Sequence, residues 1–292
     1  MTTTWNGAIT ALSSIAHGGE THGTITLLRR ELIAQPDGHL VHVPIISGNT
    51  LRGRLRRVGE ELLRDTLKYE GEISPAAAHA LRGGGALAKS SHEPLSGNRL
   101  QNLRNLVPQI GVFGAAGGGV IIDGAVDVGK VVPHVSETTH ITGVPSSVSM
   151  FNATQIETYA RQDDSTSHDF ANVLAASEPM TMFLDSDGAP NISSNAPTTQ
   201  QMVFNVETFP AGTTFSSWIR LRRPTALELA FFVDVLEEYG LDARLGGRIG
   251  VGHGRIHLGL HAVPALAAER LDWRTEVIEH RAEILEALET LA

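Results

Sequence analysis

The chain has 292 residues, 41% hydrophobic and 19% charged, and it contains no cysteine. This composition predicts a globular protein of one large or two modest domains with an ample core, and it excludes disulfides and thiolate metal sites. A net charge of −9 argues against a uniformly basic nucleic-acid-binding protein. Residues 1–130 carry 13 basic and 11 acidic side chains, whereas the rest of the chain carries 10 and 21, so any positive field is expected in residues 1–130.

The first elements are two strands joined by a loop that contains glycines and histidines. Strands are predicted at 7–12 and at 24–33, and the second includes Arg29 and Arg30. The connecting loop contains His17 and His22. Metal binding needs further ligands, and no third ligand stands at helical or hairpin spacing, so no metal site is expected and His17 is assigned to phosphate contact.

The chain is organised around the turn and helix that follow a strand at 40–46. Ser47, Gly48 and Asn49 form the turn, and a helix over 50–69 is predicted because apolar residues recur there at spacings of four, three and four. Ser47, Asn49 and Thr50 are candidate N-caps. Four arginines follow within six residues, at positions Arg52, Arg54, Arg56 and Arg57.

Two interpretations of this arginine cluster remain open on the residues alone. Guanidinium groups beside the free N–H groups of a helix N-terminus suit an extended phosphate backbone. Alternatively, the arginines form a solvated face of an amphipathic helix, partly neutralised by Glu60 and Glu61 four residues after Arg56 and Arg57.

The remaining elements alternate between helices, strands and glycine-rich turns. The glycines of 111–119 precede a strand rather than a helix, which is the wrong order for a phosphate-binding loop. The patterns predict helices at 74–82, 101–110, 224–240 and 265–290, a mobile loop at 82–98, strands at 120–128 and 256–260, a hairpin over 202–221 and a glycine-rich turn at 246–255.

Five segments, in order along the chain, resemble the motifs of one known family. The stretch 44–56, Pro-Ile-Ile-Ser-Gly-Asn-Thr-Leu-Arg-Gly-Arg-Leu-Arg, resembles the signature of the RAMP superfamily, the RNA-binding proteins of CRISPR systems. The other matching segments are 9–19, 112–114, 207–213 and 245–254. Residues 11–19 and 28–31 look most like the backbone subunit of type IV complexes.

This resemblance implies an α+β fold, with a ferredoxin-like (RRM-type) palm and an inserted thumb hairpin. It implies a single domain over 1–292, in which 133–200 is the insertion, and a non-catalytic subunit without metal or cofactor. The expected partners are a guide RNA, a complementary target, further copies of the chain and other CRISPR effector subunits. The residues expected to contact RNA are His17, Arg29, Arg30, Ser47, Gly48, Asn49, Arg52, Arg54, Arg56, Gly246, Gly247, Arg248, Gly250 and His253.

Stacking aromatics of the usual RRM kind are not recognisable, so contact with phosphate and sugar rather than base sequence is expected. An alternative is a RAMP endoribonuclease, either cleaving a target or processing a guide. Target-cleaving relatives use an Asp in the loop that here runs from His17 to Thr24, where Glu20 is the only acid. A third alternative is a protein that binds a small ligand through its glycine loops. With no apolar run long enough to span a membrane and no signal pattern at the N-terminus, a cytoplasmic location is expected.

Overall fold

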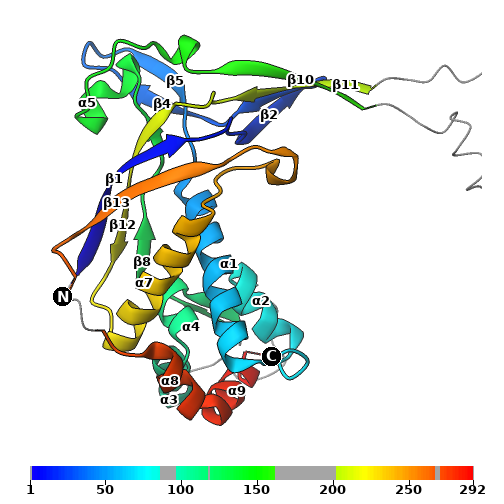
Figure 1. Cartoon of the computed structure of the whole chain (residues 1–292), viewed down its shortest axis with the longest axis vertical. Helices are drawn as coiled ribbons and strands as arrows, with labels where there is room; N and C mark the ends of the chain where they lie inside the picture. The colour runs from blue at the N-terminus through cyan, green and yellow to red at the C-terminus, as the bar shows by residue number, and fades with distance from the viewer. Residues whose placement is uncertain (1, 86–96, 118, 162–201, 267–269, 292) are drawn as a thin grey trace, which may run out of the picture.

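The computed structural model describes residues 2–85, 97–117, 119–161, 202–266 and 270–291, and an antiparallel sheet lies at its centre (Figure 1). The strands lie in the order β13, β1, β12 and β8, and β9 also pairs with β12. Their bounds are β1 Thr3–Ala11, β8 Val126–Val128, β9 Val132–Pro133, β12 Thr214–Leu221 and β13 Ile256–Val263. Because helices lie between β1 and β8 and again between β12 and β13, the succession is that of a ferredoxin-like β-α-β-β-α-β fold, and the predicted α+β class is confirmed.

Helices pack together beside this sheet and enclose the main core. The two long ones, α1 Gly48–Leu67 and α7 Ala226–Leu241, lie side by side in Figure 1. Thr225 and Glu228 begin α7 with a capping box in which each side chain bonds to the other's backbone N–H. The core joins sheet and helix side chains that are almost fully buried, among them Trp5, Ile9, Leu51, Leu55, Phe113, Phe215, Phe231 and Phe232.

A second sheet extends away from the centre, and we call it the arm. It has the strand order β10, β11, β3, β2, and only the β11–β3 pair is parallel. The bounds are β2 Gly18–His22, β3 Ile25–Leu28, β10 Gln155–Arg161 and β11 Met202–Thr208. Figure 1 shows β10 and β11 reaching out beyond the central sheet. Of the predicted insertion over 133–200, residues 162–200 lie outside the described residues.

The other elements complete the two ends of the molecule. Two small antiparallel pairs are formed by β4 with β5 and by β6 with β7. Their bounds and those of the remaining helices and turns are β4 Arg30–Ala34, β5 Leu40–Pro44, β6 Ala115–Gly117, β7 Val120–Ile122, α2 Pro75–Gly83, α3 Gly97–Leu106, α4 Pro108–Phe113, η1 Ser136–Thr138, α5 Thr139–Thr142, η2 Met150–Asn152, η5 Ile249–Val251, α8 Trp273–Glu279 and α9 Arg281–Glu289. Most of the loop predicted at 82–98 lies outside the described residues.

The hairpin predicted over 202–221 is wrong. Its two strands, β11 and β12, belong to different sheets, because the turn at 210–212 carries the chain from the arm to the central sheet. Phe209 and Ile15 pair backbone to backbone at this point, with N···O distances of 2.9 and 3.0 Å. The two crossings between the sheets therefore lie side by side.

Several predicted elements are interrupted rather than misplaced. The strand at 24–33 is divided between β3 and β4, the strand at 120–128 between β7 and β8, and the helix at 101–110 between α3 and α4. The long helix at 265–290 is two helices, α8 and α9, separated at His280. The loop at 13–23 contains strand β2, which pairs with β3. At each break within a predicted strand the chain moves to a new partner strand, and the local sequence pattern does not encode that partner.

Candidate nucleic-acid interface

The turn before α1 is built by contacts with two other parts of the chain. Ser47 is the N-cap, and its hydroxyl accepts a hydrogen bond from the backbone N–H of Asn49 at 3.2 Å. The backbone N–H of Ser47 donates to Nε2 of His17, also at 3.2 Å. Gly48 is buried. A Cβ there would lie 2.6 Å from the carbonyl oxygen of Val128, so only glycine fits at this position. Asn49 is exposed, so within this turn it offers a free side-chain amide to the surface.

The arginines of α1 divide between two sides of the helix. Arg52 and Arg56 both donate to the carbonyl oxygen of Phe113 at the end of α4, Arg52 at 2.7 Å. Burial, and after it the neighbouring charge of Arg52, lower the pKa of Arg56 to about 10. Burial likewise lowers the pKa of Arg52. These two residues were predicted to contact RNA; in the structure both side chains bond to the end of α4 and line a pocket beside α1.

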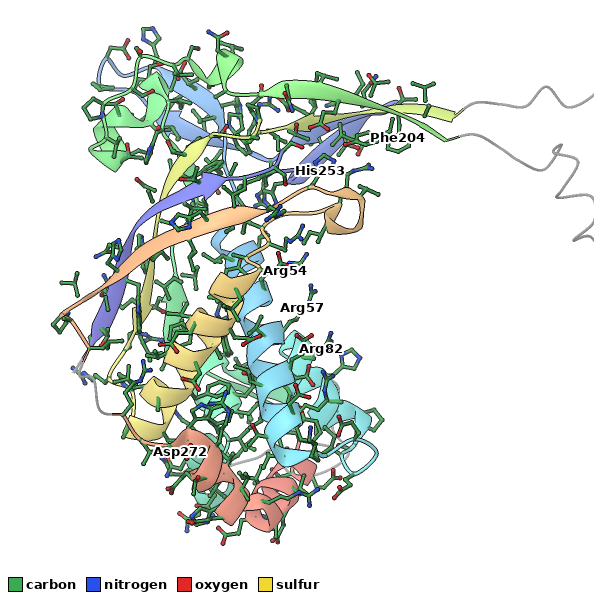
Figure 2. All side chains as sticks on the ribbon, in the orientation of Figure 1. Arg54, Arg57, Arg82, Phe204, His253 and Asp272 are labelled. Atoms are coloured by element: carbon green, nitrogen blue, oxygen red, sulfur yellow. The ribbon has the colours of Figure 1, made fainter. Side chains whose placement is uncertain are left out.

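Arg54 and Arg57 lie on the outer side of α1. Since residues are about 100° apart around a helix, Arg54 points about 200° away from Arg52. Its Nη2 donates to the carbonyl oxygen of Gly246 at 3.4 Å, and its pKa is lowered first by partial burial and then by the charge of Arg57. Arg57 is exposed. Figure 2 shows both side chains on the same side of the molecule, below the arm.

Arg29 and Arg30 also separate, because neighbouring residues of an extended chain point to opposite faces. Arg30 forms an ion pair with the buried Glu207 of β11, whose other oxygen accepts from the backbone N–H of Leu28 at 2.8 Å. Arg29 is exposed at the break between β3 and β4. Its backbone N–H donates to the carbonyl of His17 at 2.8 Å, and its charge, after burial, helps to lower the pKa of that histidine. Arg29 thus remains available to a ligand, whereas Arg30 ties the arm together.

The glycine-rich turn at 246–255 sits against the loop that follows β1. Gly246 has a φ of 88°, and a Cβ there would lie 2.3 Å from the carbonyl oxygen of Ala16. The backbone N–H of Gly247 donates to that same oxygen at 2.7 Å. Gly250 has no atom within 4 Å of its Cβ position. The fold therefore requires glycine at 246, whereas 250 is open.

Arg248 and two aromatic rings form a stack at the underside of the arm. The guanidinium of Arg248 lies 4.9 Å from the ring centroid of Phe204 and 5.7 Å from that of Tyr159. The two rings, which face each other across β10 and β11, are stacked at 5.5 Å with an interplanar angle of 18°. Arg248 itself is exposed. Planar aromatic and guanidinium groups of this kind are surfaces on which unpaired bases stack.

His253 fastens the glycine-rich turn to the arm from the inside. It is 2% exposed, its Nδ1 lies 2.9 Å from the hydroxyl of Ser14, and its Nε2 contacts the hydroxyl of Tyr159. Both ring nitrogens are thus engaged within the protein. His253 was expected at the RNA surface; the structure places it behind the turn, where it positions Tyr159.

Glu157 completes this network. Its carboxylate accepts from the hydroxyls of Thr208 at 2.7 Å and Tyr159 at 2.9 Å. Desolvation acts to raise its pKa, but the hydrogen bonds from Thr208, Ser14, Tyr159 and Gln155 outweigh it and lower the pKa to about 2. Because desolvation and the nearby carboxylate disfavour its anion, the pKa of the Tyr159 hydroxyl is raised to about 12. The charged carboxylate and neutral phenol are therefore the stable pair across the neutral range.

Glu157→Gln is expected to lower the melting temperature at neutral pH. A carboxylate whose pKa is lower in the folded state stabilises the fold above its unfolded pKa, and this contribution disappears as the pH falls toward 2. The difference from wild type should therefore be full above about pH 5 and shrink between pH 5 and pH 2. Thermal denaturation over that range measures it, with the exposed Glu279→Gln as control. A difference that stays constant down to pH 2 would contradict this role of Glu157.

The described residues contain no group of three or more His, Cys, Asp or Glu side chains placed to hold a metal ion. In the same part of the chain, every helix is too short or too polar to cross a membrane. The contacts through His17 and Gly246 and the proximity of Arg57 to Arg54 instead link a set of polar and basic residues, Arg29, Asn49, Arg54, Arg57 and Arg248, which we call the cationic face. It lies beside the Tyr159–Phe204 pair, which the sequence patterns did not reveal.

Comparison with known proteins shows that this chain is similar to a chain of a solved complex. A chain of a structure described as "Type IV-B CRISPR Complex" is 30% identical to this one. The match covers 93% of this chain and 94% of that chain, with a TM-score of 0.58. No protein-family model matches the sequence, and no curated protein matches it.

Proposed function

We propose that this chain, which belongs to the same protein family as a subunit of a type IV-B CRISPR complex, is a backbone subunit of RAMP type that binds a guide RNA. The observation that carries this proposal is the cationic face. Its arginines come from three separate segments, the β3–β4 break, α1 and the glycine-rich turn, and contacts through His17 and Gly246 link these segments in a chain whose net charge is −9. Such a local concentration of guanidinium groups in an acidic protein suits a polyanion that follows a defined path.

Hydrogen bonds between these segments support a continuous binding surface for the RNA backbone. Arg54 bonds to Gly246 beside Arg248, and Arg57 lies close enough to Arg54 to lower its pKa. Arg29 reaches the start of α1 through His17. Guanidinium groups bind phosphate oxygens in a forked geometry without distinguishing bases. The Arg248–Phe204–Tyr159 stack adds a place for an unpaired base, again without sequence preference.

The proposed subunit acts with partners. Further copies of the chain would assemble along one guide RNA, with other effector subunits, and leave the guide open to pair with a complementary target. The face of the central sheet that carries Asn6, Ala8 and Trp218 supports contact between copies, because it has a groove of about 850 Å³, lined in part by α5, beside Trp218, which is 38% exposed. Purification without added RNA tests the proposal. Bound nucleic acid, detected by absorbance at 260 nm, should be RNA and should be long enough to contact several copies of the chain. Protein that is purified free of RNA and does not bind added RNA would refute the proposal.

We also propose that the subunit does not cut RNA. Glu20 lies on β2, is exposed, and has Nε2 of His22 3.3 Å from its carboxylate. This single exposed contact lacks the fixed geometry of an acid–base pair, and a misplacement of about 1 Å can cost on the order of a hundredfold in rate.

Incubation of the assembled protein with RNA complementary to its guide, with and without Mg²⁺, should leave the target intact. The matched comparison is Glu20→Ala, which should behave like wild type in both binding and cleavage assays. Fragments at regular spacing that disappear in Glu20→Ala would instead identify the chain as an endoribonuclease.

A further inference from the structure

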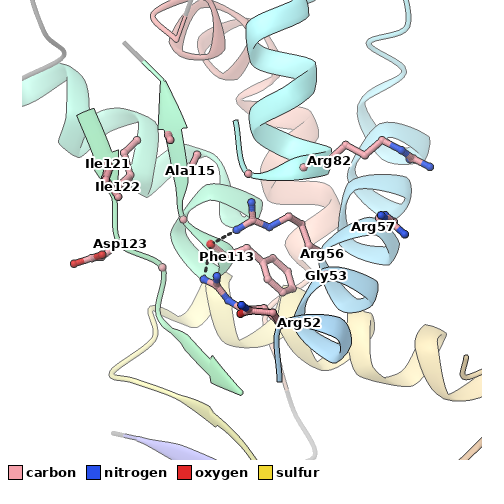
Figure 3. Close-up of a pocket in the computed structure, with 16 residues that line it drawn as sticks. Arg52, Gly53, Arg56, Arg57, Arg82, Phe113, Ala115, Ile121, Ile122 and Asp123 are labelled. Atoms are coloured by element: carbon pink, nitrogen blue, oxygen red, sulfur yellow. Dashed lines mark hydrogen bonds between the residues drawn. The ribbon is translucent and has the colours of Figure 1, made fainter. Parts of the chain in front are cut away.

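A pocket of about 460 Å³ lies on the other side of α1 from Arg54. Its walls are the first half of α1, the end of α2, and the segment from the end of α4 to the loop after β7. Figure 3 shows Arg52 and Arg56 converging there on the carbonyl oxygen of Phe113. The volume falls within the range of small-ligand sites, about 300–1,000 Å³.

Two guanidinium groups meet in this pocket without a carboxylate partner. Among the described residues neither Arg52 nor Arg56 has an acidic oxygen within 4.0 Å, although Arg56 is only 8% exposed. Nε of Arg52 is buried and has no hydrogen-bond partner. Asp127 is paired with Arg222 at 3.1 Å, and Figure 3 shows Asp123 directed away from the two guanidinium groups. Buried charges of one sign are costly unless an opposite charge joins them.

Gly53 gives the pocket room at a position where the helix gains nothing from glycine. It lies inside α1, where glycine costs roughly 1 kcal/mol relative to alanine. No atom lies within 4 Å of where its Cβ would be. By contrast, a Cβ at Gly59 in the same helix would lie 2.4 Å from Gln109 Oε1, so Gly59 is required for packing. Packing within the described protein therefore explains Gly59 and leaves Gly53 as open space on the pocket wall.

We propose that this pocket binds one nucleotide, with its phosphate group on Arg52 and Arg56 and its nucleoside in the space beside Gly53. Guanidinium pairs suit the tetrahedral oxyanion, and the volume exceeds what a phosphate alone requires. The choice of a nucleotide over another oxyanion rests on the proposed function. The pocket adjoins the cationic face, since Asn49 and Arg57 line it, but Arg54 points to the opposite side of α1 from Arg52 and does not line it. The nucleotide has two possible sources, a free mononucleotide or one residue of the bound RNA.

Calorimetric titration of the full-length protein with inorganic phosphate, adenosine 5′-monophosphate and adenosine tests the assignment. Two variants remove the site: Gly53→Leu fills the open space, and Arg52→Gln removes a charge but keeps a donor toward Phe113. Gly240→Leu is the matched control, since Gly240 is the other helical glycine of α1 and α7 with no atom within 4 Å of its Cβ position. Thermal denaturation verifies that each variant is folded.

The monophosphate should bind to wild type and to Gly240→Leu with the same affinity. Its affinity for Gly53→Leu and for Arg52→Gln should be lower by roughly tenfold or more, and adenosine should not bind to any of the four proteins. If RNA displaces the monophosphate, the nucleotide belongs to the RNA; if both bind together, it is a free nucleotide. Equal binding of adenosine, no binding of the monophosphate, or undiminished binding to both variants would overturn the proposal. RNA binding that depends on Arg54 and Arg248, which do not line the pocket, tests the cationic face separately, so either assignment can fail alone.

Discussion

Combined replacement of Arg54 and Arg57 by alanine is expected to weaken binding of single-stranded RNA of any sequence by roughly tenfold to a hundredfold. Both residues lie on α1, and within the described ranges their one side-chain hydrogen bond or ion pair is the 3.4 Å bond from Arg54 to Gly246. The loss should therefore come from phosphate contacts rather than from unfolding. Arg52 and Arg56 are poor choices for this test, because their side chains hold the end of α4.

Salt dependence distinguishes phosphate contact from a general charge effect. Each phosphate contact on a single strand contributes about 0.7 to the slope of log K against log salt, so the double variant should lower that slope by about 1.4. Arg270→Ala combined with Arg274→Ala removes the same charge beside α7 and α8, where both arginines pair with acidic side chains. This control should bind RNA like wild type. An unchanged slope in the Arg54 and Arg57 variant, or an equal loss in the control, would contradict the cationic face.

Gly246→Ala is expected to destabilise the fold by about 2–4 kcal/mol, which combines the strain of a left-handed backbone with overpacking. The added Cβ would meet the carbonyl oxygen of Ala16 at 2.3 Å, and that oxygen already accepts the hydrogen bond from Gly247. A backbone oxygen held in this way has little freedom to move. The glycine-rich turn should then separate from the loop after β1, and Arg248 would lose its position over the arm.

Gly250→Ala provides the comparison within the same turn. Its Cβ position is open and its φ is not in the left-handed region, so the free energy of unfolding should change by about 0.5 kcal/mol or less. Urea denaturation of the two variants measures the difference. Gly250→Val is the variant that can disturb RNA or a neighbouring copy while the palm stays folded. Equal destabilisation by Gly246→Ala and Gly250→Ala would show that the turn does not depend on its contact with Ala16.

The fold could be predicted from the sequence where local signals decide it. The helix after Ser47 and the helix after Thr225 both begin at a cap and follow an apolar stripe, and both are present. The hairpin over 202–221 failed because the alternating pattern is the same whether two strands pair with each other or with distant partners. Only the tertiary pairing of Phe209 with Ile15 shows that the chain changes sheets there.

The candidate site could be predicted as a region but not residue by residue. The spacing of the arginines placed Arg52 and Arg56 beside the apolar stripe of α1, and whether such a flank faces solvent depends on what packs against it. Here the end of α4 needs donors for the Phe113 carbonyl, and the two arginines supply them. Tyr159 and Phe204 became neighbours through the register of β10 with β11, which joins segments on either side of residues 162–201.

The position of β1 in the central sheet has a consequence for the order of events during synthesis. β1 leaves the ribosome before every other strand of this sheet, yet its two neighbours are β12 and β13, which begin at Thr214 and Ile256. The strand that contains Trp5 and Ile9 is therefore paired on both edges only after β13 has been synthesised. Contacts between such distant segments form slowly, because closing a long loop costs conformational entropy before the contacts contribute any stabilising free energy. The nascent chain thus carries an unpaired apolar strand until β12 and β13 have been synthesised, and the native sheet closes only after both are available.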